Sequence, residues 1–130
     1  MNYSLFITGS PTASRACHTA LDFAEALLSE GNHQIHGVFF YEEAVAIANS
    51  LAMPPRDECN IRNEWSTFAK QHNIPLYICI AAALRRGELN EAEAKRHEVE
   101  HYNLADGFHL EGLGSLLSLT LESDRVMRFK

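Results

Sequence analysis

Residues Pro75–Gly87 read PLYICIAAALRRG, an apolar strand-like segment that leads directly into an alanine-rich helical one. In an open α/β sheet, reacting groups collect at the carboxyl ends of the strands, where a following helix directs unpaired N–H groups and partial positive charge forward. Cys79 stands at this junction. A cysteine so placed can lose its proton more easily than a free thiol, and the thiolate is the reactive form. The alternative is that Cys79 is a small core residue, since unpaired cysteine is among the most buried residue types.

The rest of the chain alternates strand-like and helix-like segments, which predicts a three-layer α/β/α fold with a mainly parallel sheet of about five strands. Strands are expected at residues 3–8, 35–41, 76–80, 107–110 and 124–129. Helices are expected at residues 14–30, 42–51, 59–72, 90–99 and 113–121, besides the alanine-rich segment. With no linker, internal repeat or low-complexity tract between them, these segments predict a single domain over residues 1–130.

Composition narrows the functional classes. The 130 residues are 46% hydrophobic and 22% charged, as in ordinary globular proteins that need neither disulfides nor metal to hold a core. The net charge is −6 and the longest basic run is the pair Arg85-Arg86, so tight binding of nucleic acid is not expected. No apolar stretch approaches the ~20 residues of a membrane span, and the N-terminus lacks the pattern of a secretory signal. A cytoplasmic protein without membrane contact is expected.

The other two cysteines are weaker candidates for chemistry. Cys17 falls on the apolar stripe of the first expected helix, which predicts a core position. Cys59 follows Asp57 and Glu58, whose negative charges oppose formation of a thiolate. Three cysteines without a C-x-x-C pair also argue against a disulfide framework. Cys79 is therefore the one predicted catalytic residue.

Three further features have simple structural interpretations. Arg85 and Arg86 could raise the positive potential near Cys79 or bind an acidic partner, but cations at a helix end also complement the helix dipole. His97 and His101 could share a helix face, yet no recognised metal-ligand pattern accompanies them, so no metal site is expected. The loop Thr8–Ser14 is similar to the phosphate-binding loop of flavodoxin-like proteins, which leaves a flavin- or nucleotide-binding module as an alternative.

Several segments together carry a family resemblance. They are Val38–Tyr41, Glu43, Ala48-Asn49, Ile78–Gly87, Gly107-Phe108, Gly112–Gly114 and Asp124–Val126. In these segments the chain resembles the DsrE/TusD family of sulfurtransferase subunits, over nearly its whole length, and Ile78–Gly87 is the most specific of them. The loop Ser10–Arg15 departs from the Pro-aromatic-Gly sequence associated with the family, which puts any role of this loop in shaping the sulfur pocket in doubt.

The resemblance implies a DsrE-like fold and a sulfur relay. The cysteine that matches Cys79 would accept sulfane sulfur as a persulfide and pass it on, with no metal or organic cofactor. The implied partners are TusB-like and TusC-like subunits in a heterohexamer, a TusA-like sulfur donor and a TusE-like acceptor, and the implied end product is 2-thiouridine at the tRNA wobble position. The alternatives are a DsrE-type subunit of a sulfur-oxidation relay and a non-catalytic subunit in which Cys79 is buried.

Overall fold

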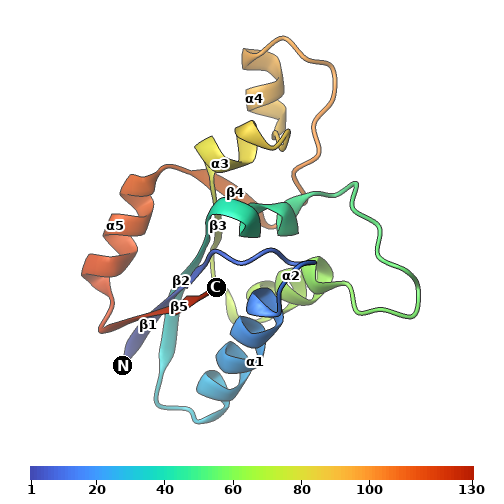
Figure 1. Ribbon diagram of the computed structural model, residues 1–130. Helices are drawn as coiled ribbons and strands as arrows, with labels where there is room; N and C mark the ends of the chain where they lie inside the picture. The colour runs from blue at the N-terminus through green and yellow to red at the C-terminus, as the bar shows by residue number, and fades with distance from the viewer.

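The computed structural model describes residues 1–130, which form one five-stranded sheet in the order β4-β3-β2-β1-β5, with every neighbouring pair parallel (Figure 1). The strands are β1 (Asn2–Ile7), β2 (Gln34–Phe40), β3 (Leu76–Cys79), β4 (Phe108–Glu111) and β5 (Arg125–Phe129). The helices are α1 (Ala16–Ser29), the 3-10 helix η1 (Glu42–Ala48), α2 (Ile61–His72), α3 (Ile80–Arg85), α4 (Glu91–Arg96) and α5 (Leu113–Glu122). The predicted α/β fold with a parallel sheet is confirmed.

The sheet is covered by helices on both faces. Figure 1 shows α1 and α2 on one side of the strands and α5 on the other. Successive strand residues point to opposite faces, and two residues of β2 mark them. Phe40 packs edge-to-face against Trp65 of α2, with ring centroids 5.8 Å apart. Gly37 lies beneath α5, because a Cβ at this position would come within 2.8 Å of Leu119 Cδ2. A glycine here allows α5 to approach the sheet closely.

The core lies mainly between the sheet and the α1/α2 layer. The apolar stripe expected on α1 is buried, and so are Trp65, Phe68 and Ala69 of α2. Trp65 is fully buried, and its indole Nε1 donates a hydrogen bond to the carbonyl oxygen of Cys17, 2.9 Å away. This bond satisfies the one polar group of the largest core side chain and joins α2 to α1.

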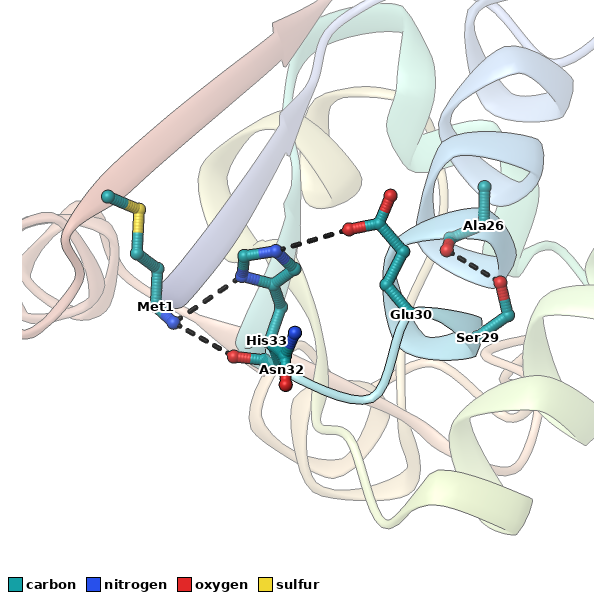
Figure 2. A network of polar contacts seen from close by, with 6 residues as sticks. All are labelled: Met1, Ala26, Ser29, Glu30, Asn32 and His33. Atoms are coloured by element: carbon teal, nitrogen blue, oxygen red, sulfur yellow. Dashed lines mark hydrogen bonds and ion pairs between the residues drawn. The ribbon is translucent and has the colours of Figure 1, made fainter.

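The amino ends of the strands are held by a polar network around the N-terminus (Figure 2). The Met1 ammonium donates to the carbonyl oxygen of Asn32 at 3.2 Å and lies 3.4 Å from His33 Nδ1. His33 Nε2 is in turn 3.4 Å from a carboxylate oxygen of Glu30. These contacts join the start of β1 to the connection between α1 and β2. Because all strands are parallel, the network lies at the end of the sheet opposite to Cys79.

Two expected helices are shorter than the sequence pattern indicated. The segment 42–51 is a 3-10 helix that ends at Ala48, because Asn49 adopts an extended conformation and forms a β-bridge with Leu104. The segment 90–99 is helical only to Arg96, and Glu98 then takes a positive φ of 58° that reverses the chain. His97 and His101 therefore do not share a helix face. None of the helices combines the length and the apolar character that a membrane crossing requires.

Candidate functional site

Cys79 is the last residue of β3 and directly precedes α3, as the sequence predicts. Its backbone (φ −59°, ψ 118°) is not helical, so Cys79 serves as the N-cap residue of α3 without an intervening loop. β3 is flanked by β2 and β4, so the thiol stands at the carboxyl end of an interior strand of a parallel sheet. Its side chain is only 2% exposed.

Small side chains explain how α3 fits at this place. Ala82 and Ala83 are buried and let the short helix lie against η1. Arg86, at the end of α3, donates to the carbonyl oxygen of Ala82 at 3.1 Å and forms an ion pair of 2.7 Å with Glu43 of η1. The hydrogen bond and the charge of Arg86 lower the pKa of Glu43. Arg86 thus joins α3 to η1, and Arg85 is exposed, so neither arginine is engaged with the sulfur.

Glu111 is the residue that the strand register places beside Cys79. In the parallel pair of β3 and β4, Cys79 is the direct partner of Glu111, so both side chains leave the sheet on the same face. Glu111 is half-buried, and its Oε2 accepts a hydrogen bond of 3.0 Å from Ser115 Oγ at the start of α5. The sequence did not identify Glu111 as a neighbour of Cys79, because the expected strand ended at Leu110 and a sequence pattern does not reveal which strands are adjacent.

The other two thiols are unfavourable as thiolates. Cys17 is fully buried, and desolvation raises its pKa to about 12. Cys59 is exposed and donates to Glu64 Oε2 at 2.9 Å; this hydrogen bond, with burial and the carboxylate charge adding to it, raises the pKa of the Cys59 thiol. Cys17 donates to the carbonyl oxygen of Gly9, whereas no such acceptor holds Cys79 Sγ. The raised pKa values of Cys17 and Cys59 thus have identifiable causes in their surroundings.

The loop Thr8–Ser14 is occupied by its own hydrogen bonds. Ser10 Oγ accepts from the amides of Thr12 and Ala13 at 3.2 and 3.1 Å, and Ser14 Oγ accepts from the amide of Ala16 at 3.2 Å. Amides at this position are the donors that a phosphate group would need. Because they are already used within the chain, the geometry disfavours the alternative of a flavin- or nucleotide-phosphate site.

A cavity of about 790 Å³ lies beside this loop and away from Cys79. It extends beneath the segment 52–60 and carries charges of both signs. Its lining includes Arg15, His18, Asp22, Glu58, Cys59 and Arg62. No group of three or more His, Cys, Asp or Glu side chains is arranged to hold a metal ion, here or elsewhere in the chain.

Glu88 is a buried acidic residue that the sequence pattern did not single out. It follows Gly87, whose φ of 77° turns the chain after α3, and it is only 2% exposed. Its Oε1 has no hydrogen-bond partner. Burial raises the pKa of Glu88 to about 7, against the opposing charge of Arg86. Near neutral pH a partly protonated carboxyl therefore lies three residues beyond the end of α3.

Comparison with known proteins places this architecture in a family. Residues 1–129 match the DsrE/DsrF-like family. The chain is 43% identical to a sulfurtransferase TusD homolog of Vibrio vulnificus (strain CMCP6) over 129 residues, covering 99% of this chain and 98% of that protein. It is 45% identical to sulfurtransferase TusD of Salmonella enteritidis PT4 (strain P125109), covering 99% and 100%. The fold matches the crystal structure of the ychN protein from E. coli with a TM-score of 0.75 and 24% identity, covering 99% of both chains. This chain belongs to the DsrE/DsrF-like family.

Proposed function

We propose that this chain is a sulfurtransferase subunit that carries sulfane sulfur as a persulfide on Cys79 and passes it to another protein. The sulfurtransferase activity follows from relatives of that name which match the chain over its full length. The observation that supports Cys79 as the carrier is its place at the carboxyl end of β3 and the start of α3, in a chain whose other thiols have raised pKa values.

The chemistry needs one nucleophilic sulfur and no cofactor. The Cys79 thiolate attacks the outer sulfur of a donor persulfide, a new S–S bond forms at Sγ, and the donor S–S bond breaks with its electron pair on the inner donor sulfur. The departing thiolate takes up a proton. In the second half of the relay, an acceptor thiolate attacks the outer sulfur now on Cys79 and releases the Cys79 thiolate. No net oxidation or reduction occurs in either step.

The burial of Cys79 suits a carrier whose loaded form must be protected. A persulfide is readily reduced by free thiols, and a closed site prevents such side reactions. The 2% exposure of Cys79 in the free chain therefore fits a sulfur that becomes accessible only when the donor or acceptor docks. A core cysteine without a role would be equally buried, so reactivity, rather than burial, separates the two interpretations.

The relatives' name favours the branch that leads to 2-thiouridine at the tRNA wobble position over a sulfur-oxidation relay. On this proposal the chain is cytoplasmic, receives sulfur from a TusA-like protein, delivers it to a TusE-like protein, and is assembled with TusB-like and TusC-like subunits in a heterohexamer. The net charge of −6 supports a step before the tRNA, where another protein binds the nucleic acid.

Helix α5 offers a surface for this assembly, and its disruption is predicted to separate the complex. Leu113, Leu117 and Leu121 follow one another at helical spacing and are 51, 59 and 77% exposed, while Leu119 is the only buried residue of the helix. When the chain is co-expressed with its neighbouring subunits, Leu117→Glu is expected to weaken co-purification at least tenfold, because a charge would have to be buried in an apolar contact.

The matched control is Ser118→Glu, which adds the same charge at the next, exposed position of α5. It should co-purify nearly as well as the unaltered chain. Equal recovery of the Leu117→Glu and Ser118→Glu complexes would exclude α5 as the contact, and recovery of the unaltered chain only as a monomer would contradict the assembly itself.

Intact-mass measurement tests the function directly. The purified chain, incubated with cysteine persulfide and then freed of excess donor, is expected to gain the mass of one sulfur atom and to lose it on treatment with a reductant. Peptide mapping should place the added sulfur on Cys79. An adduct located on Cys59, or no adduct on the free chain and on its co-expressed complex, would contradict the proposal. A flavin would instead be detected by the visible absorbance of the purified protein.

A further inference from the structure

The register of the sheet brings a carboxylate to the proposed carrier sulfur. Neighbouring strands are about 4.8 Å apart, and residues paired in a parallel ladder extend their side chains on the same face. Cys79 and Glu111 are such a pair, at the last position of both strands. Their Cβ atoms are thus about 5 Å apart, and the longer glutamate side chain can span that separation.

The surroundings of Glu111 leave one oxygen available. Ser115 Oγ donates to Oε2 at 3.0 Å and holds the carboxylate at the start of α5, whereas Oε1 has no such donor. The other charged groups near β3 are paired or exposed, apart from Glu88, which is buried but lies three residues beyond α3 and outside the sheet. Glu43 and Arg86 pair with each other, and Arg85 is exposed. The residue of β2 next to this end of β3 is the apolar Phe40, paired with Ile78. Glu111 is therefore the one carboxylate that the strand register pairs with Cys79.

We propose that Glu111 is the proton acceptor for Cys79 when the thiol receives sulfur. This inference rests on the proposed function, which it deepens by naming the group that takes the proton of the carrier thiol. Glu64 holds the proton of Cys59 in a hydrogen bond of the free chain, whereas Glu111 would meet the Cys79 proton only during the transfer. In the free chain the two side chains form no hydrogen bond. Such bonds are often long or absent before the substrate binds and shorten only in the reacting complex.

Glu111 takes the proton from Cys79 Sγ as Sγ forms a bond to the outer sulfur of the donor persulfide. The donor S–S bond breaks, its electron pair stays on the inner sulfur, and that sulfur takes up the proton that Glu111 accepted. The products are the Cys79 persulfide and the donor thiol, and the Glu111 carboxylate is restored for the next transfer.

Glu111→Gln tests the proposal because glutamine keeps the size of the side chain and its bond to Ser115 but cannot accept a proton. Loading of Cys79 by cysteine persulfide is followed by rapid quenching and intact mass between pH 6 and pH 10. At pH 7 the variant is expected to load at least tenfold more slowly than the unaltered chain. At the alkaline end, where solvent hydroxide removes the thiol proton, the two rates should converge.

This alkaline recovery distinguishes a proton acceptor from a structural residue, whose loss would slow loading at every pH. Glu122→Gln is the matched control, since Glu122 is an exposed carboxylate at the far end of α5, paired with His36. The Glu122→Gln variant should load at the same rates as the unaltered chain between pH 6 and pH 10. Equal profiles for Glu111→Gln and the unaltered chain, or faster loading by Glu111→Gln at pH 7, would overturn the role of Glu111. Failure of the unaltered chain to load at Cys79 would instead overturn the proposed function.

Discussion

Cys79→Ser is expected to abolish the uptake of sulfur from cysteine persulfide, the largest effect that any single substitution in this chain should have. A serine hydroxyl is not ionised at neutral pH and cannot form a persulfide, so no partial activity should remain. Intact mass after incubation with the donor measures the loss. The Cys79→Ser variant should also fail to transfer sulfur to a partner protein. It should not restore thiolation in a strain that lacks the native protein.

The other cysteines provide the controls. Cys59→Ser removes an exposed thiol and should load like the unaltered chain. Cys17→Ser places a hydroxyl in the core, which costs about 1–3 kcal/mol of folding free energy, but the folded fraction should still load. Because Cys79 is itself buried, Cys79→Ala is a second variant that avoids a buried hydroxyl. A reductant-sensitive adduct on folded Cys79→Ser or Cys79→Ala would refute the mechanism.

The parts of the fold that could be predicted are those encoded within single segments. The apolar stripe of α1 and the pair Gly31-Asn32 predicted a helix that ends near residue 30, and Gly31 does adopt a positive φ of 81° after it. The order of strand-like and helix-like segments predicted a parallel sheet. The junction at Cys79 was predictable because β3 and α3 are contiguous in the chain.

The parts that could not be predicted depend on contacts between distant segments. Glu111 is 32 positions from Cys79, and its proximity follows only from the adjacency and register of β3 and β4. η1 ends early because Asn49 bridges to Leu104, a contact with no local signal. The burial of Glu88 was equally hidden, since a glutamate after Arg86-Gly87 has the sequence pattern of an exposed turn.

Glu88→Gln is expected to make the folded state less sensitive to pH. The pKa of Glu88 is raised from its ordinary 4.5 to about 7 in the folded chain, so between these values the folded state retains a proton that the unfolded state has released. Its contribution to stability therefore falls as pH rises from about 4.5 to 7 and is then constant. At about 1.4 kcal/mol per pKa unit, and allowing for partial screening, the loss above pH 7 is roughly 2 kcal/mol.

Glutamine keeps the volume of the buried side chain and stays neutral. Glu88→Gln should therefore be more stable than the unaltered chain only at pH values at which Glu88 is ionised. Urea unfolding is expected to find Glu88→Gln about as stable as the unaltered chain at pH 5 and roughly 2 kcal/mol more stable at pH 8. Glu91→Gln, at an exposed position of α4, should change stability by no more than a few tenths of a kcal/mol at either pH. A constant difference between Glu88→Gln and the unaltered chain across this range would show that Glu88 does not titrate in the core. A difference that grows between pH 5 and pH 7 and is then constant would mean that ionised Glu88 destabilises the chain just beyond α3, the helix that positions Cys79.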